Sequence, residues 1–378
     1  MMDIDKLNKG WDELVESIKY AIRNRTAPNS IKFNGKTEKE FRDDTMETVS
    51  EEYYDKGQTQ RRLNDWTRES EDSLWTIMGY RAFEPSKFNI EGIFKEDEEI
   101  SSIISIDDQT YLLFGSRGNI AKTTDTFQTF TGKPLSVDDR VTAVAYSSEL
   151  IVVGTKAGHL LQSNDLGESW VEVDLSITNL DEFEFDDEIV AIRLDSAGYW
   201  YISSKTQFIR SSSTGWEGGT FEAEAFGIPP AADKVQDFDI EPDTDHVYIA
   251  ADTGLYYTET GDTWYHIETG LDNNVCFVRF SNRKSLVACN EQNVVAVRRS
   301  KDHDWITGEL QEPIVDADSN EDGLWVGVGI DGGIYRSLDD GYRWRRILRE
   351  QSGFSVHYRR PRWVLGRTYG DYLLARDD

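Results

Sequence analysis

The feature that most constrains the fold of this chain is a repeated strand pattern, which begins near residue 98 and runs to the C-terminal end. Each repeat reads as three apolar strands separated by turns, followed by a polar turn that ends in an aromatic residue. Equivalent positions in six successive repeats are separated by 40, 48, 46, 43 and 37 residues. These positions are Asp125, Asp165, Ser213, Glu259, Asp302 and Asp339. Repeats of this length indicate one four-stranded blade each, so the sequence predicts a β-propeller.

A seventh repeat ends before its fourth strand. A further step of 38 residues from Asp339 reaches Asp377, one residue before the end of the sequence. A three-stranded last blade would leave an unpaired edge beside the first blade, so another part of the chain has to supply the missing strand. We expect residues 74–90 to pair with residues 371–377 and close the ring, with Leu74–Phe83 as the candidate strand.

The beginning of the chain follows a helical pattern instead. Leu7, Trp11 and Ile18 fall on one face of a helix, and a second apolar stripe follows after a polar, charged stretch. We therefore predict a mainly β chain: a seven-bladed β-propeller over residues 77–378, preceded by an N-terminal α-helical anchoring or docking domain over residues 1–76.

Two of the polar turns share the motif Ser-x-Asp-x-Gly-x-x-Trp. We interpret its residues as structural, because the carboxylate can accept backbone N–H groups across the turn and glycine permits a positive φ, while the tryptophan packs beneath. The structural residues are Ser163, Asp165, Gly167, Trp170, Ser337, Asp339, Gly341 and Trp344. Decayed copies carry Glu259 in the fourth repeat, and Ser300 and Asp302 in a shortened turn of the fifth.

The two complete turns resemble the Asp-box (BNR) motif of a β-propeller family. The resemblance implies that these turns lie at the periphery, away from the central channel where ligands of the family usually bind. Sialidases of this family use three arginines, a Tyr/Glu nucleophile and an Asp acid/base. Their first arginine lies near the start of the propeller, whereas the nearest match here, Tyr358–Pro361, lies in the last repeat. We therefore expect no catalytic residues and keep a sialidase-like glycosidase as an alternative.

The composition excludes several partner classes. The formal charge is −29, and only 16 residues are lysine, which together suggest a halophilic source. This charge argues against binding nucleic acid or inserting into an anionic membrane. The start Met1–Lys6 lacks the features of a signal peptide. Two cysteines and five scattered histidines indicate no metal site, and we expect no cofactor.

One segment reverses the charge of the chain. Between Arg343 and Arg367 there are eight arginines and a single acid, Glu350. These arginines either neutralise acids of neighbouring blades or contact an acidic partner protein or anionic glycan, since guanidinium groups form bidentate pairs with carboxylates. The candidate binding residues are Arg343, Arg345, Arg346, Arg349, Arg359, Arg360 and Arg362.

These features favour a non-enzymatic structural or adhesion protein. A helical anchor before a propeller resembles the layout of tail and baseplate proteins of tailed viruses, with haloarchaeal viruses as the natural setting. We expect a virion component, oligomeric within a larger assembly, that binds other subunits, a host-surface glycan or an S-layer. Outside a virion, the absence of a signal peptide predicts a cytoplasmic protein. A further alternative is an intracellular assembly factor, similar to the propellers that help to build photosystems.

Overall fold

A computed structural model describes residues 86–376, apart from residues 91, 96, 148–149, 178–184, 214–219, 272–273, 301–302, 349–352 and 368–369. The predicted helical domain and the stretch Leu74–Phe83 lie outside the described residues. Residues Pro85–Asp377 form one compact unit. No helix in the described part of the chain is long and apolar enough to span a membrane.

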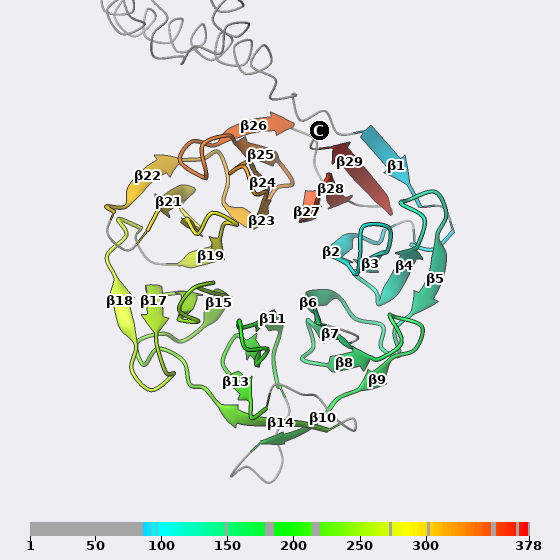
Figure 1. The fold of residues 1–378 in the computed structure, drawn as a ribbon, viewed down its shortest axis with the longest axis horizontal. Helices are drawn as coiled ribbons and strands as arrows, with labels where there is room; N and C mark the ends of the chain where they lie inside the picture. The colour runs from blue at the N-terminus through cyan, green and yellow to red at the C-terminus, as the bar shows by residue number, and fades with distance from the viewer. Residues whose placement is uncertain are drawn as a thin grey trace, which may run out of the picture. The chain divides into compact units, whose positions relative to one another are not determined.

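Seven sheets surround a central channel, and each sheet is one blade (Figure 1). Blade 1 contains β2 (Ile100–Ser105), β3 (Tyr111–Gly115), β4 (Asn119–Thr123) and β5 (Thr131–Pro134). Blade 2 contains β6 (Val141–Ser147), β7 (Leu150–Thr155), β8 (Leu160–Ser163) and β9 (Val171–Glu172). Blade 3 contains β11 (Ile189–Leu194), β12 (Trp200–Ser204), β13 (Phe208–Ser211), β14 (Thr220–Ala225) and β10 (Asp174–Ile177). Blade 4 contains β15 (Val235–Ile240), β16 (Val247–Ala251), β17 (Gly254–Thr258) and β18 (Tyr265–Ile267).

The remaining three blades follow the same order from the channel outward. Blade 5 contains β19 (Val275–Phe280), β20 (Leu286–Asn290), β21 (Val294–Arg298) and β22 (Ile306–Glu309). Blade 6 contains β23 (Ile314–Ser319), β24 (Trp325–Gly329), β25 (Ile334–Ser337) and β26 (Arg345–Leu348). Blade 7 contains β27 (Gly353–Arg359), β28 (Arg362–Arg367), β29 (Asp371–Arg376) and β1 (Ser86–Asn89). The predicted seven-bladed β-propeller is therefore confirmed.

The ring closes by pairing the two ends of the described chain. Strand β1 runs antiparallel to β29, and Ser86 pairs with Leu374 while Asn89 pairs with Asp371. The closing strand falls within the expected range 74–90, but it is Ser86–Asn89 and not the candidate Leu74–Phe83. Because β1 covers the outer edge of β29, the last blade presents no three-stranded edge to blade 1.

Blade 3 carries a fifth strand that the repeat pattern does not predict. After leaving the outer strand of blade 2, β9, the chain continues within two residues into β10. Strand β10 then pairs in parallel with β14, from Asp174 opposite Thr220 to Ile177 opposite Ala223. This crossing joins the outer edges of blades 2 and 3.

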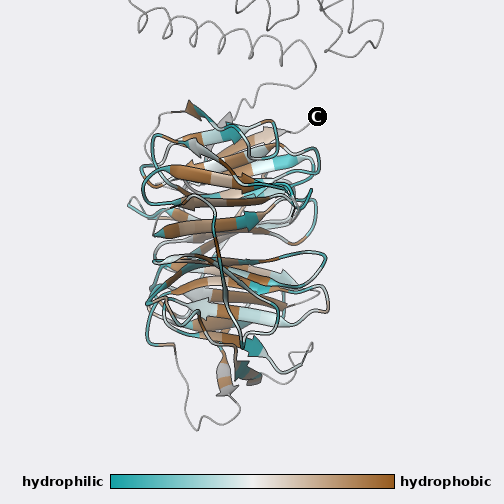
Figure 2. Ribbon diagram, turned by 90° about the vertical axis from the view of Figure 1, so that its left-hand side faces the viewer, coloured by the Kyte–Doolittle hydropathy of each residue, from teal (hydrophilic) through white to brown (hydrophobic). Residues whose placement is uncertain are grey.

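The core lies between successive blades. Side chains from facing sheets form one apolar cluster at each of six junctions, from blades 7 and 1 round to blades 5 and 6. The second strand of each of blades 1 to 6 is buried throughout, except at the partly buried Leu150 that begins β7. Figure 2 shows apolar strands stacked through the disc, with polar residues concentrated towards its surfaces. A strand packed on both faces has no solvated side, which explains why these strands read as continuous apolar runs.

All seven innermost strands have the same irregularity. Each pairing with the second strand shifts register between the first and third residues, so the second residue is a β-bulge. The bulged residues are Ser101, Thr142, Val190, Gln236, Cys276, Val315 and Phe354. This shared bulge and the strand pairing align every position of one blade with its counterpart in the next.

Candidate binding surfaces

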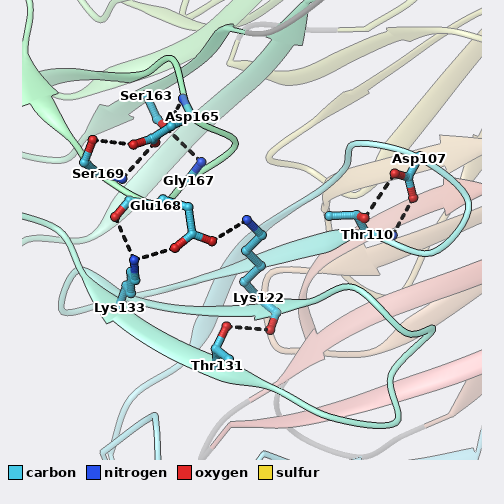
Figure 3. A network of polar contacts seen from close by, with 10 residues as sticks. All are labelled: Asp107, Thr110, Lys122, Thr131, Lys133, Ser163, Asp165, Gly167, Glu168 and Ser169. Carbon is cyan, nitrogen blue, oxygen red and sulfur yellow. Dashed lines mark hydrogen bonds and ion pairs between the residues drawn. The ribbon is translucent and has the colours of Figure 1, made fainter.

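The complete turn of blade 2 is organised around one carboxylate (Figure 3). Oδ1 of Asp165 accepts the backbone N–H of Ser169 at 2.8 Å, and Oδ2 accepts the Ser169 hydroxyl at 2.6 Å. The hydroxyl of Ser163 donates to Asp165 and accepts the N–H of Gly167. Partial burial opposes ionisation, but the hydrogen bonds lower the pKa of Asp165 to about 2. The ring of Trp170 packs edge-on against Phe114 of blade 1.

Blade 6 repeats this arrangement. Ser337 donates its hydroxyl to Asp339 and accepts the N–H of Gly341, while Oδ1 of Asp339 accepts the N–H of Arg343 at 2.8 Å. The ring of Trp344 lies 6.0 Å from that of the buried Trp325 within its own blade. These side chains are engaged within the turn and support it structurally.

Two decayed copies lie at other residues than the sequence suggested. In blade 4 the first turn position, equivalent to Ser163, is Thr258 rather than Tyr257, because Thr258 pairs with Val247 and its hydroxyl accepts the N–H of Gly261. Glu259 therefore does not occupy the aspartate position of the motif, as the sequence had suggested. In blade 5 the pairing of Leu286 with Arg298 places Arg298, not Ser300, at that position. The turn of blade 4 is one residue shorter than the full motif, whereas the turn of blade 5 has the full length from Arg298 to Trp305 and is not shortened as the sequence suggested. Blade 5 lacks the serine and aspartate of the motif at their positions, so an alignment based on residue identity alone is displaced.

The three arginines of blade 6 differ in their surroundings. Arg343 is 81% exposed, and its Nε lies 3.8 Å from Asp339. Arg346 lies 3.3 Å from the buried carboxylate of Glu312 and also donates to the Leu348 carbonyl. Arg345 is half-buried. The structure therefore uses Arg346 internally and leaves Arg343 facing solvent.

The arginines of blade 7 lie at the turn between β27 and β28. Arg359 pairs with Asp108 of blade 1 at 3.2 Å, and Arg362 donates to the backbone carbonyl of Asp108. Arg360 is exposed, and Arg349 lies outside the described residues. The predicted arginine set thus separates into two groups on different blades, and part of each group neutralises its own propeller.

The channel contains charged residues that sequence reasoning missed. Arg193 of blade 3 lies 3.5 Å from Asp237 and 3.4 Å from Asp239 of blade 4, and Arg279 of blade 5 lies 3.7 Å from both Asp237 and Asp316. Arg193, Asp237, Arg279 and Asp316 line a cavity of about 480 Å³, together with residues of all the other blades.

The channel carboxylates also join neighbouring blades. Asp237 and Asp239 accept the N–H groups of Val278 and Phe280 in blade 5, at 3.2 and 2.7 Å. Asp316 and Asp318 do the same for Val356 and Tyr358 in blade 7. Innermost strands are sheet edges, so these carboxylates satisfy N–H groups that the ladder leaves free.

Burial changes the pKa of several channel groups. It raises the pKa of Asp237 to about 7, against the effect of Arg193, and raises those of Asp316 and Asp318 to about 6. Burial lowers the pKa of His357 to about 4, and its Nε2 lies 2.8 Å from the Ser105 hydroxyl. The channel therefore titrates near neutral pH.

A different cluster fills the outer junction between blades 1 and 2 (Figure 3). Glu168, in the turn of blade 2, pairs with Lys122 at 2.7 Å and with Lys133 at 2.5 Å, both from blade 1. Lys133 also donates to the Glu168 carbonyl. We call these three residues the Lys–Glu clamp.

No family model matches the chain, and no curated protein matches it either. Among solved structures, it is similar to YCF48 bound to a D1 peptide, with 14% identity, a TM-score of 0.61, and coverage of 78% of this chain and 97% of that one. The WD40 propeller domain of Doa1 gives 12% identity, a TM-score of 0.59, and coverage of 78% and 98%. The extracellular domain of BT4673 from B. thetaiotaomicron gives 10% identity and a TM-score of 0.64, and the match covers 79% of this chain and 42% of that one. At these identities the likeness shows the fold alone, a β-propeller.

Proposed function

We propose that this chain is a non-enzymatic scaffold that binds an acidic partner protein through exposed arginines of blades 6 and 7. The observation that carries the proposal is the exposure of Arg343 and Arg360 on a chain whose formal charge is −29. Arginine side chains that face solvent can form charge-assisted hydrogen bonds with the carboxylates of a partner protein.

Two further observations support a binding role. YCF48, which has a similar fold, was solved bound to a D1 peptide. The four channel carboxylates each accept a backbone N–H group of the next blade, so their positions already have a structural purpose. This supports a scaffold rather than a glycosidase.

The test uses the full chain and its native partner. Extract from the source organism is passed over the immobilised chain, and bound proteins are identified and titrated against purified variants. The double variant Arg343→Glu with Arg360→Glu should weaken binding by about tenfold or more, because each reversal replaces attraction with repulsion. Lys156→Glu, which reverses an exposed charge of blade 2, is the control and should leave binding unchanged. Equal binding by all three proteins would refute the arginine contact, and hydrolysis of a sialoside would refute the non-enzymatic role.

We further propose that this scaffold belongs to a virion or another surface assembly. The support is the sequence layout, in which a helical pattern precedes the propeller. Mass spectrometry of purified virus particles from the source should detect the chain, and its absence from them would remove this setting while leaving the binding role intact.

A further inference from the structure

Every blade has one outer-strand position that faces the next blade. In blade 1 it is Lys133, which pairs with Ile120 of the third strand. Strand pairing and backbone hydrogen bonds identify its counterparts. In blades 2, 3, 4, 6 and 7 they are Val173, Phe226, Ile267, Leu348 and Phe88. Blade 5 alone has glycine there, Gly308, opposite Val295.

Large side chains at this position fill the space between blades. Lys133 belongs to the Lys–Glu clamp, Phe226 packs edge-on against Trp264 of blade 4, and Ile267 packs into the apolar cluster between blades 4 and 5. At the junction between blades 5 and 6, Gly308 has no side chain, and a groove of about 620 Å³ lies there.

The backbone does not require this glycine. A Cβ atom at Gly308 would meet only Val295 Cγ1 at 3.6 Å, an ordinary van der Waals distance. The other clamp residues are also replaced: Val297 occupies the position of Lys122, and Tyr342 occupies that of Glu168. Val297 and Tyr342 both pack in the apolar cluster of this junction, so the filling side chain is missing at Gly308, without a backbone reason.

The groove is lined by apolar and aromatic side chains together with charged groups of both signs. Ile306, at the edge of the groove, is 50% exposed, and Trp344 and Leu310 contribute further apolar surface. The Arg299 guanidinium lies 4.9 Å from the ring centre of Tyr342. A half-exposed aliphatic side chain beside aromatic rings is the kind of surface that a partner side chain can cover.

Two exposed arginines border this surface. Arg299 and Arg343 reach it from opposite blades, and both are exposed. The carboxylates that also line it are Glu309 and Asp339, and Asp339 is already engaged by its turn. The cations around the apolar hollow favour an occupant that bears negative charge.

We propose that this groove receives a large apolar side chain from an acidic segment of a partner protein. The partner's side chain would occupy the space that blades 1 to 4 fill with the side chain of their own outer strand. Arg299 and Arg343 would pair with carboxylates that flank it. This inference rests on the proposed function, which supplies the acidic partner and the role of Arg343. It adds the groove beside Gly308 and the role of Arg299.

The first arm of the test uses a defined probe. A peptide Gly-Glu-Glu-X-Glu-Glu-Gly, in which X is 4-fluorophenylalanine, is titrated with the full chain and followed by fluorine NMR. Unlabelled competitors carry Phe or Ala at X, or Lys in place of Glu. We expect the Phe peptide to compete about tenfold better than the Ala or Lys peptide, because one apolar side chain and its flanking charges each contribute on this scale.

The second arm fills the groove. Gly308→Phe should weaken probe binding by about tenfold or more without lowering the Tm, since the groove has room for the ring. Thr131→Phe adds the same ring to the outer strand of blade 1, where the Lys–Glu clamp occupies the junction, and should leave probe binding unchanged. Arg299→Glu reverses a charge at the groove without filling it and should also weaken probe binding. Arg360→Glu, which lies outside the groove, should leave probe binding unchanged.

The outcomes separate the two proposals. The groove proposal would be wrong if neither Gly308→Phe nor Arg299→Glu weakened probe binding. It would also be wrong if the Lys-flanked peptide displaced the probe as well as the Phe peptide does. Displacement of the probe by sialyllactose would overturn it too, because the occupant would then be a glycan. A native partner that responds to Arg360→Glu but not to Gly308→Phe would leave the proposed function standing and the groove wrong. If probe binding depends on Gly308 but binding of the native partner is unchanged by the arginine reversals, the groove proposal would be supported and the proposed arginine contact would be refuted.

Discussion

The junction between blades 1 and 2 and the junction between blades 5 and 6 are built on the same turn but filled differently. In both junctions, the glycine of the Ser-x-Asp-x-Gly-x-x-Trp turn lies close to the second strand of the preceding blade. Gly167 lies near Leu112, and Gly341 lies near Val287. A few ångströms further out, the first junction has the Lys–Glu clamp and the second has the groove beside Gly308. The repeat constrains the turn because the backbone needs it, whereas the adjacent outer position is free to vary.

The largest expected effect tests this distinction between glycines. Gly167 and Gly341 have φ values of +85° and +89°, and a Cβ would lie 2.5 and 2.6 Å from buried methyl groups of the preceding blade. Gly167→Ala and Gly341→Ala should therefore each destabilise the propeller by about 2 to 4 kcal/mol, from backbone strain together with overpacking. Denaturant unfolding of the purified full chain measures both.

Gly308→Ala is the matched control, because its Cβ would make ordinary contacts. We expect a stability change within about 0.5 kcal/mol of zero for it. If Gly308→Ala lowered the unfolding free energy as much as Gly167→Ala and Gly341→Ala, the backbone would require glycine at position 308. The proposed difference between the turn glycines and Gly308 would then be wrong.

The second test concerns the channel, where the two junctions also differ. Blades 1 and 2 place Ile104 and Ala145 at the position that holds Arg279 in blade 5 and Asp318 in blade 6. At this position the charged side chains belong to blades 3 to 7, and so do the channel groups whose pKa values are shifted. The carboxyl of Asp237, with its pKa near 7, is the strongest contributor.

The sign of the pH dependence follows from the direction of the shifts. A carboxyl whose pKa is raised in the folded state contributes stability below its unfolded value, near 4, which is lost as pH rises through the folded value. Asp237 therefore destabilises the fold between pH 4 and 7, and Asp316 and Asp318 act between pH 4 and 6. His357, with its pKa lowered to about 4, acts in the opposite direction up to pH 6.5.

We expect the Tm to fall by about 5 °C between pH 5 and pH 8, or about 2 kcal/mol for a domain of this size. Asp237→Asn removes the titration but keeps an oxygen that can accept the Val278 N–H group, so most of the slope above pH 6.5 should disappear. A wild-type Tm that rises over this interval would contradict the channel assignment.

The sequence was sufficient for the architecture because strand spacing is a property of the backbone. Seven blades and terminal closure follow from the step of about forty residues, and β1 lies within the expected range. The extra strand β10 could not be predicted, because it belongs to the connection after β9 and pairs in parallel with a different blade. The shorter turn of blade 4 and the missing motif residues of blade 5 displaced the sequence alignment, since Thr258 and Arg298 are identified only by strand pairing.

The site was harder to find than the fold. The arginine-rich end was visible as a local reversal of charge, but burial decides that Arg346 serves Glu312 while Arg343 faces solvent. Asp237 follows a strand pattern that would suit a solvated face just as well. Gly308 looks ordinary in a sequence with 29 glycines, and only the register that pairs it with Val295 shows that its counterparts are large.

The smallest expected effect comes from moving the clamp from one junction to the other. The variant Gly308→Lys, Tyr342→Glu places the exposed pair of the clamp, Lys133 with Glu168, at its equivalent positions between blades 5 and 6, and leaves the buried Val297 unchanged. Ion pairs at a half-exposed site contribute about 0 to 1 kcal/mol, so unfolding free energy should change little relative to wild type. The groove should nevertheless be closed, and the fluorinated probe should bind about tenfold more weakly. The variant Glu168→Gln removes the ion pairs of the original clamp and should lower the unfolding free energy by less than about 1 kcal/mol. This loss should disappear in 1 M salt, because salt screens exposed ion pairs in the wild-type protein as well. A transplanted clamp that left probe binding intact would show that the space beside Gly308 is not where the probe binds, and the two junctions would then differ in filling but not in function.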